Sequence, residues 1–530
     1  MLNGKRSPRL VLAVIGFGVF VAADDLTVVS TMLRQIIFDL GIPLPGGLDD
    51  AAWIVNAYLI AYVVVMPFIG RVSDIVGRRA VYVASLLLFL LGSIWVPFSV
   101  SLPADVRLPA FIVGRVLTAL GGGAMVPVGM AIIGDLYRPE KRASALGVLG
   151  AIDTAGWVWG PLYGALLVRF LSWQWQFYLN IPLSLIGIAA TWWALQDIPQ
   201  PEARTRIDWL GAALLTAGLL ALNVGLLNSS DIQSVSSFSE LSQAPSQATL
   251  PLYVVAAVCF AGFVFVERRL QQPLPPSPAG PSERRSDDPS TSLSAPLIDL
   301  TLFRRDNFSP AVSINFLVGA VLIIAMVNVP LFINVVELDL AQAALASGWL
   351  LSAMTASMAL TSYAGGHFTE RWSYRPVTLL GLLLCAIAFA FMGLSWSAGT
   401  PYRQMAWQLA LLGAGFGLVT APISAAVINA APAGQRGIAA SLVIVFRLIG
   451  MSVGLSALTA WGLRRFNQLR TQVELPPIGD PNFATALATA LTNVTATVLA
   501  ETFLVSAVIA ALALLAALLL RRDRSEGRER

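Results

Sequence analysis

Four ionisable residues lie inside long apolar runs of this sequence, namely Asp25, Arg115, Asp153 and Arg447. A charged side chain at the centre of a bilayer costs on the order of 3 kcal/mol or more, so such residues usually face a partner or a water-filled cavity. Burial raises the pKa of a carboxyl group and a nearby cation lowers it, so moving an arginine relative to an acid loads or releases a proton. These residues therefore suggest proton transfer within a membrane.

Depth along the apolar runs predicts two acid–base pairs. Asp25 and Arg115 both fall in the outer half of the membrane. Asp153 and Arg447 both fall near its middle. Pairs at matching depth suit a proton relay or an alternating-access lock, and a purely structural role is the alternative. Asp24 points about 100° away from Asp25 on a helix, so only one of these two acids is expected to face a cavity.

Composition indicates that most of the chain is buried in a membrane. The 530 residues are 56% hydrophobic and 12% charged, whereas an ordinary soluble domain carries about 25% charged residues. The only histidine is His367, and the two cysteines, Cys259 and Cys385, lie in apolar runs without metal-binding spacing. We therefore expect no enzymatic activity, no metal and no cofactor. The ionisable residues within the apolar runs suggest instead that a proton gradient supplies the energy.

Apolar runs predict an all-α, polytopic membrane protein with fourteen transmembrane helices. The first run is longer than the roughly 7 to 15 residues of a cleavable signal core. It is also long enough to cross the roughly 30 Å hydrocarbon core of a bilayer. The predicted spans are 10–33, 51–69, 80–100, 108–133, 144–168, 177–195, 209–228, 250–266, 309–335, 346–366, 376–396, 405–428, 437–461 and 497–520.

Basic residues orient this array of helices. Of the 34 Lys and Arg residues, 25 fall on the side of the two termini, 7 on the other side and two within spans. Loops rich in Lys and Arg remain in the cytoplasm. We therefore predict a multi-pass membrane protein with both termini in the cytoplasm.

The order of the spans divides the chain into two bundles of six helices with two further helices between them. A stretch rich in Pro, Ser and charge predicts a flexible linker, and transporters built from duplicated halves show this organisation. The predicted parts are an N-terminal bundle (1–200), two inserted helices (201–268), a flexible cytoplasmic linker (269–308), a C-terminal bundle (309–520) and a basic cytoplasmic tail (521–530).

Two short cytoplasmic loops share a pattern in which a glycine is followed four residues later by an acid and then by arginine. Such a carboxylate can cap a neighbouring helix, while the arginines pair with acids across the junction of the two halves and latch one conformation. General anchoring of the loops at the membrane surface is the alternative. The predicted latch consists of Gly70, Asp74, Gly77, Arg78, Arg79, Glu370 and Arg371.

The span 144–168 contains the pattern GxxxGPxxG. Gly156, Gly160 and Gly164 would allow another helix backbone to approach closely, and Pro161 would bend the span. This pattern predicts a structural role rather than a catalytic one.

Helical patterning continues past the span 437–461 to about Glu474 and stops at Pro476 and Pro477. A helix of that length would be roughly 55 Å long at 1.5 Å per residue, which exceeds the hydrocarbon core by about 25 Å. We predict that the last two helices project as a hairpin, about 462–496, into the external space. A loop on the membrane surface is the alternative.

Together these motifs resemble the fourteen-helix drug:proton antiporter branch of the major facilitator superfamily. The segment DLT that begins at Asp25 is similar to the D-x-T pattern of its first helix. Arg115 in GRVLTALGGG resembles its fourth-helix motif, although Thr118 and Ala119 replace the usual Gln and Gly. The stretch LIDLTLFRR at 297–305 matches the one that typically precedes its last six helices.

Within that branch, the chain is similar to the mycobacterial triacylglyceride transporters, once described as multidrug efflux proteins. The resemblance implies that Asp25 is the first-helix acid and Arg447 the arginine of the thirteenth helix. Gly70, Asp74, Gly77, Arg78 and Arg79 resemble the signature loop between the second and third helices of the superfamily, with Asp74 as its acid. The glutamate that this family carries in its fifth helix falls at Thr154, with Asp153 one position earlier. The resemblance therefore leaves undecided whether Asp153 and Arg447 form an alternating-access lock.

The resemblance implies proton-coupled export of a triacylglyceride-like lipid or another large amphipathic molecule by alternating access. Export of small hydrophobic drugs through the same machinery is the alternative. The expected partners are a membrane lipid or hydrophobic small molecule and a periplasmic lipid-carrying lipoprotein. We expect a monomer that binds no nucleic acid.

Overall fold

The structure is a computed structural model that describes residues 7–42, 48–197, 206–229, 249–271, 294–337, 340–473 and 483–521. These residues form fourteen α-helices, two short 3-10 helices and two strands of two residues each, so the all-α prediction is confirmed. By length and apolar composition, eleven helices within the described ranges can cross a membrane.

The first six helices pack into one bundle, in which α1 contacts α4, α5 and α6 and α3 contacts α4 and α6. Prolines such as Pro67 and Pro127 lie inside these helices, where neighbouring helices can satisfy the backbone groups that a proline leaves unpaired. The six helices are α1 (Pro8–Leu40), α2 (Leu48–Val76), α3 (Arg78–Ser99), α4 (Ala104–Leu136), α5 (Pro139–Phe170) and α6 (Gln174–Ala194).

Local signals define the length of α1, the helix that carries both candidate acids. The side chain of Ser7 accepts a hydrogen bond from the backbone N–H of Leu10, and Pro8 occupies the first helical position. At the other end, Gly41 adopts a left-handed conformation with φ of 73° and its N–H closes the helix. The helix therefore runs 33 residues without a break.

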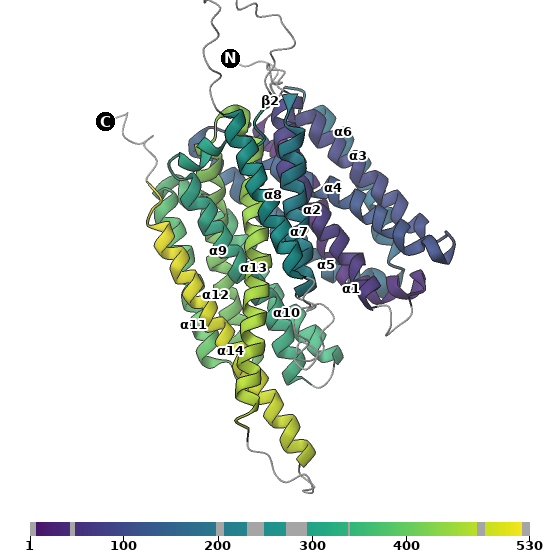
Figure 1. The fold of residues 1–530 in the computed structure, drawn as a ribbon, viewed down its shortest axis with the longest axis vertical. Coiled ribbons are helices and arrows are strands. Elements are labelled where there is room, and N and C mark those ends of the chain that lie inside the picture. Colours follow the sequence, from purple (N-terminus) through teal and green to yellow (C-terminus); the bar gives the residue numbers. More distant parts are fainter. Residues whose placement is uncertain are drawn as a thin grey trace, which may run out of the picture.

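The last six helices form a second bundle, in which α9 packs against α13 and α14 and α12 packs against α10 and α11. Figure 1 shows this bundle beside the first, with the described ends of α1 and α14 that adjoin the termini at the same end of the molecule. We call this the terminal end. The helices are α9 (Phe308–Val336), α10 (Leu340–Trp372), α11 (Tyr374–Ser395), α12 (Tyr402–Ala430), α13 (Arg436–Arg470) and α14 (Phe483–Ala517).

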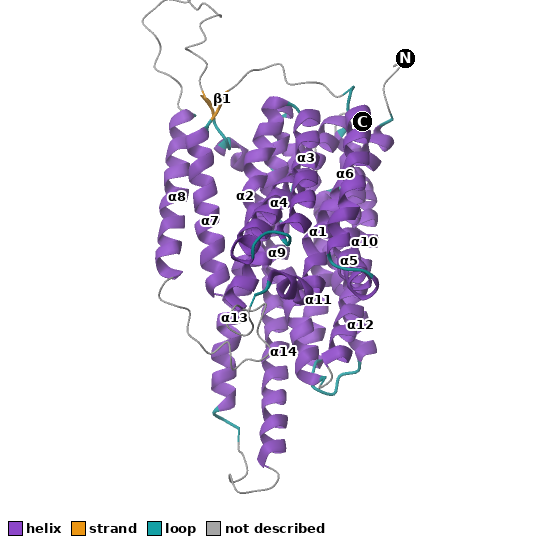
Figure 2. Ribbon diagram, turned by 90° about the vertical axis from the view of Figure 1, so that its right-hand side faces the viewer, coloured by secondary structure: helices purple, strands orange, loops and turns teal. Residues whose placement is uncertain are grey.

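Two further helices, α7 (Trp209–Ser229) and α8 (Thr249–Leu270), pack against each other at one edge of the molecule (Figure 2). α7 touches α2 of the first bundle and α13 of the second. The two strands β1 (Arg206–Ile207) and β2 (Ser294–Ala295) pair in parallel beside them. The inserted pair therefore lies against the junction of the two bundles.

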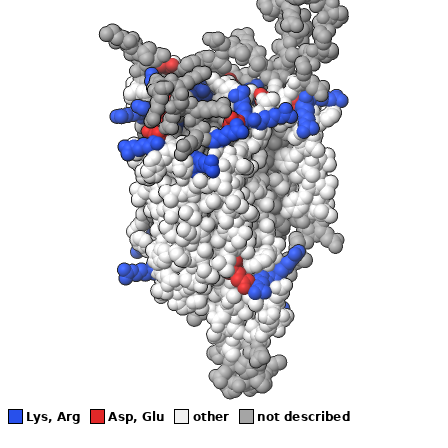
Figure 3. Space-filling model, turned by 90° about the vertical axis from the view of Figure 1, so that its left-hand side faces the viewer, with Lys and Arg blue, Asp and Glu red and all other residues white. Residues whose placement is uncertain are grey.

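Charged residues are distributed as a membrane protein requires. Lys, Arg, Asp and Glu gather at the terminal end of the visible face, whereas a broad middle band is almost free of them (Figure 3). Such a band matches the hydrocarbon core, because a charged side chain that faces lipid is costly. The molecule therefore has the surface of a multi-pass membrane protein.

Helices from the two bundles cross in a reciprocal pattern, because α2 packs against α13 and α5 packs against α10. The second helix of each bundle thus contacts the fifth helix of the other. Glycines make both contacts close: a Cβ at Gly70 would lie 2.5 Å from the carbonyl oxygen of Gly437, and a Cβ at Gly366 would lie 2.5 Å from that of Ala143. The halves therefore meet backbone to backbone.

α13 and α14 are each 35 residues long, or about 52 Å at 1.5 Å per residue, whereas the hydrocarbon core is about 30 Å thick. Both project beyond the other helices at the end opposite the termini (Figures 1 and 2). Arg465 of α13 donates two hydrogen bonds to the carboxylate of Glu501 on α14, from Nε to Oε2 (2.7 Å) and from Nη2 to Oε1 (2.9 Å). The tip of the predicted hairpin, residues 474–482, lies outside the described residues.

Part of the predicted flexible linker is held in place. Residues 272–293 lie outside the described residues, but from Ser294 the chain forms β2 and then the 3-10 helix η3 (Leu300–Arg304). The buried Glu267 of α8 accepts hydrogen bonds from the backbone N–H groups of Leu297 (2.9 Å) and Ile298 (3.2 Å). The end of the linker is therefore ordered by a buried carboxylate that sequence analysis did not single out.

Replacing Glu267 with alanine is expected to loosen this segment. Leu297 and Ile298 are buried, and a buried N–H without an acceptor costs about 1–3 kcal/mol, where 1.4 kcal/mol is a factor of ten in an equilibrium constant. We expect amide hydrogen exchange at both residues to accelerate roughly tenfold or more. The exposed neighbour Arg268 provides the control Arg268→Ala, and unchanged exchange in Glu267→Ala would contradict the prediction.

Candidate functional site

A buried ion pair joins α1 to α4. Arg115 Nη1 lies 2.9 Å from Asp25 Oδ2, and the side chains are 1% and 0% exposed. Asn180 Nδ2 donates a hydrogen bond of 3.3 Å to Asp25 Oδ1, and the guanidinium of Arg115 lies 4.1 Å from the ring centroid of Tyr58. The pairing predicted from depth is therefore found, and the acid is held by groups from two helices.

Asp24 is also buried, with a different partner. Gln176 Nε2 of α6 donates a hydrogen bond of 2.9 Å to Asp24 Oδ2, and Asp24 is 6% exposed. Among the described residues, no Lys or Arg forms an ion pair with Asp24. Both adjacent acids are buried, because α1 is covered on both sides, by α4 at Asp25 and by α6 at Asp24. The expectation that only one of them faces a cavity stays a prediction.

The glycine pattern of α5 packs against α1 beside these acids. A Cβ at Gly156 would lie 3.2 Å from the backbone nitrogen of Asp24, and one at Gly160 would lie 2.9 Å from its carbonyl oxygen. One turn further, a Cβ at Gly164 would lie 3.1 Å from the carbonyl oxygen of Val28. Any larger residue would push the helices apart, so the glycines position the acids through backbone contact.

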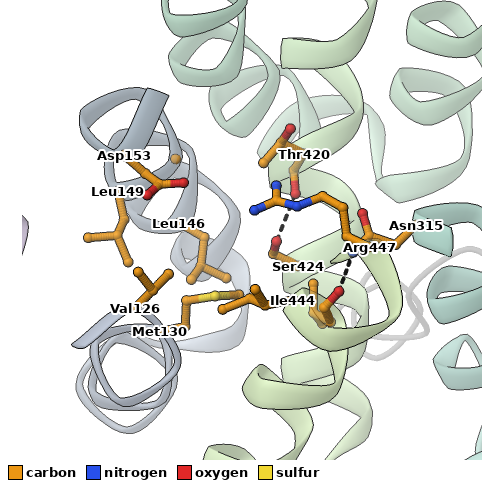
Figure 4. Close-up of a pocket in the computed structure, with 12 residues that line it drawn as sticks. Val126, Met130, Leu146, Leu149, Asp153, Asn315, Thr420, Ser424, Ile444 and Arg447 are labelled. Carbon is orange, nitrogen blue, oxygen red and sulfur yellow. Dashed lines mark hydrogen bonds between the residues drawn. The ribbon is translucent and has the colours of Figure 1, made fainter. Parts of the chain in front are cut away.

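A pocket between the two bundles contains the second predicted pair. Asp153 of α5 and Arg447 of α13 both line it, and the other lining residues are mainly apolar, such as Leu149 and Ile444. Figure 4 shows the carboxylate of Asp153 and the guanidinium of Arg447 directed into the pocket from opposite walls. These two described residues do not form a direct ion pair. The pocket thus offers one acid and one cation, each from a different bundle.

Position 154, where related transporters are expected to carry glutamate, does not line this pocket. The hydroxyl of Thr154 donates a hydrogen bond of 2.8 Å to the carbonyl oxygen of Gly150, and the residue is 7% exposed. Asp153 faces the pocket instead. The structure therefore puts an acid opposite Arg447 despite the one-residue shift in the sequence.

The signature loop closes the junction of the bundles at the terminal end. Asp74 accepts hydrogen bonds from the backbone N–H groups of Gly437 (2.9 Å) and Ile438 (3.1 Å) at the start of α13. This carboxylate therefore caps a helix of the other bundle and interacts favourably with its dipole. Arg78 Nη2 lies 2.5 Å from Asp74 Oδ1 and fixes its orientation.

A residue that sequence analysis missed completes this junction. Asp135, at the end of α4, lies 3.0 Å from Arg78 Nε and 2.9 Å from Arg436 Nη1. It therefore bridges an arginine from each bundle. The signal in the sequence was a single acid at the end of a long apolar run, directly before a basic loop.

The remaining residues of the predicted latch lie elsewhere. Gly77 has φ of 110° and precedes α3, where a residue with a side chain would be strained. Arg79 stacks over the ring of Trp192 on α6, 3.8 Å from its centroid. Glu370 Oε2 lies 4.0 Å from Nδ1 of His367 in the same helix. Among the described residues, neither Glu370 nor the adjoining Arg371 forms an ion pair with the first bundle.

The fold and the sequence both match known transporters. The structure superposes on the proton:xylose symporter XylE with a TM-score of 0.60 and 12% identity, covering 96% of this chain and 94% of that one. A family profile described as Major Facilitator Superfamily matches residues 15–228 and 237–455. This chain belongs to the Major Facilitator Superfamily. The transporter therefore shares a two-bundle architecture with proteins to which its sequence is only distantly similar.

Several sequence relatives of this superfamily member are much more similar. It is 31% identical to the triacylglyceride transporter of Mycolicibacterium hassiacum over 90% of this chain and 84% of that protein. It is 31% identical to the probable triacylglyceride transporter of Mycobacterium leprae over 88% of this chain and 87% of that protein. The similarity therefore extends over nearly the full length of both relatives.

Proposed function

We propose that this transporter exports a triacylglyceride-like lipid, or a large amphipathic molecule of similar character, across a bacterial plasma membrane. The main support is the projecting pair α13 and α14 in a chain similar to triacylglyceride transporters along most of its length. A pair of helices that extends beyond the bilayer can shield an acyl chain that leaves it, and a periplasmic lipid-carrying lipoprotein would receive the lipid there.

We further propose fourteen spans, with α5, α7 and α10 crossing the membrane beside the eleven helices that meet the length and hydropathy criteria. The reciprocal contacts α2–α13 and α5–α10 support two duplicated bundles, 1–200 and 309–520, with 201–268 inserted between them. The excess of basic residues supports a cytoplasmic terminal end. On this assignment the hairpin is external.

In this mechanism Asp25 and Arg115 are the proton-coupling pair, because an acid neutralised by a movable cation can exchange a proton when the cation moves. Asp153 and Arg447 stand on opposite walls of the pocket, so closing the pocket would bring them together. Binding of substrate between them would then be sensitive to the protonation of Asp153. This arrangement supports antiport of protons against substrate.

The signature loop supports alternating access. Asp74, Asp135 and Arg436 join the two bundles at the terminal end, which we assign to the cytoplasm. On this assignment, these contacts support a state closed on the cytoplasmic side. Opening to the cytoplasm would break these contacts as the bundles rock about the pocket.

Deletion of residues 464–482 tests the lipid assignment. We expect the deletion to abolish export of a labelled triacylglyceride from proteoliposomes with a proton gradient, while efflux of a small hydrophobic dye continues, because the pocket remains intact. Deletion of 231–247, predicted on the same face of the membrane, is the control and should leave both activities. Equal loss of both activities in the 464–482 variant would contradict a dedicated lipid path and favour drug export as the function.

A further inference from the structure

The buried acid Asp24 has no role in the proposed cycle. Asp24 is 6% exposed and Gln176 is 1% exposed, and a single hydrogen bond from Gln176 Nε2 to Asp24 Oδ2 joins them. The second oxygen of the carboxyl group, Asp24 Oδ1, and the amide oxygen, Gln176 Oε1, are buried and without a hydrogen-bond partner among the described residues. Two acceptors are therefore left over at one buried contact.

A single proton on the carboxyl group of Asp24 would give both of these oxygens a hydrogen-bond partner. An ionised carboxylate only accepts hydrogen bonds, and the amide oxygen of glutamine also only accepts. A protonated carboxyl group has one O–H donor, so it can receive the amide N–H at one oxygen and donate from the other to the amide oxygen. The pair then forms two hydrogen bonds in place of one.

The surrounding charges also favour a neutral Asp24. Arg115 is paired with Asp25, so this cation already balances one acid. A second negative charge beside Asp25 would be disfavoured by repulsion and by burial. The titratable and charged groups that face this part of α1 are Tyr58 from α2, Arg115 from α4, Tyr163 from α5 and Asp25 of α1 itself.

We propose that Asp24 and Gln176 form a proton-binding site that is separate from the Asp25–Arg115 pair, and that Asp24 carries a proton in the state closed at the terminal end. The proton comes from bulk water and changes the charge of the carboxyl group from −1 to zero. Gly156 and Gly160 touch the backbone of Asp24, and Asp153 lies one turn away on the same helix. Sliding of α5 along α1 would therefore alter this site as the pocket changes.

Infrared difference spectroscopy of the purified full-length protein tests the site directly. We expect the wild-type spectrum minus the Asp24→Asn spectrum at neutral pH to contain the C=O stretching band of a neutral carboxyl group, with the downshift in D2O that an exchangeable O–H produces. Asparagine can form both hydrogen bonds with Gln176, so this variant should fold. Gln176→Leu should shift the same band, because it removes the hydrogen-bond partner.

Asp39 provides a matched control on the same helix. It accepts hydrogen bonds from Trp173 and Gln174 but is only partly buried, so Asp39→Asn should change only carboxylate bands. A wild-type minus Asp24→Asn spectrum without a neutral-carboxyl band would overturn the proposal. The inference extends the proton-driven cycle proposed above, but the band requires no transport, so failure of lipid export would leave this result standing.

Discussion

Replacing Asp25 with asparagine is expected to abolish proton-driven export and to lower stability. Asparagine has nearly the shape of aspartate but cannot ionise, so Arg115 would remain as an unpaired charge that is 1% exposed. Removing one partner of a buried ion pair costs about 3–5 kcal/mol. We expect a clear fall in the thermal midpoint of the detergent-solubilised protein and no flux above background in proteoliposomes with a pH gradient.

A double variant separates the two effects of Asp25→Asn. Adding Arg115→Leu removes the unpaired cation, so stability should largely recover, whereas proton-driven flux should stay absent. The exposed pair of Asp306 and Arg521 offers a control, because Asp306→Asn should change neither property measurably. Flux at the wild-type level in Asp25→Asn would refute the coupling role, and a double variant as unstable as the single one would refute the charge-balance argument.

Replacing Gly437 with valine is expected to hold the transporter open at the terminal end and to abolish transport. A Cβ at this position would lie against the carbonyl oxygen of Gly70, 2.5 Å from Arg78 Nη1 and 2.7 Å from Ser73 Oγ. A Cβ atom almost never approaches another heavy atom this closely in folded proteins, so the branched side chain cannot fit in the closed junction. The bundles would therefore separate at this end.

Cysteine accessibility measures this opening. Ser424 lines the pocket, so we would label Ser424→Cys with a membrane-impermeant maleimide from the side of the terminal end, after replacing Cys259 and Cys385. Gly437→Val should raise the labelling rate tenfold or more. Gly434 is the matched control, because a Cβ there meets nothing within 4 Å. An unchanged rate with Gly437→Val would show that the close contact does not control access.

The sequence alone determined those features that depend on position along the membrane normal. Apolar runs predicted the helices, and counting along them put Asp25 level with Arg115, where the ion pair is found. The length of the helical pattern after residue 437 predicted a helix longer than a bilayer is thick, and α13 runs 35 residues from Arg436 to Arg470. Depth is a one-dimensional property that the order of residues specifies directly.

Only the tertiary structure decided which side chains of neighbouring helices contact each other. It turned Asp153 rather than Thr154 towards Arg447, gave Asp24 a partner on α6 and made Asp135 a bridge between the bundles. The direction in which a side chain leaves a helix, and the helix that it meets, depend on how fourteen helices pack together. No spacing within a single helix contains that information.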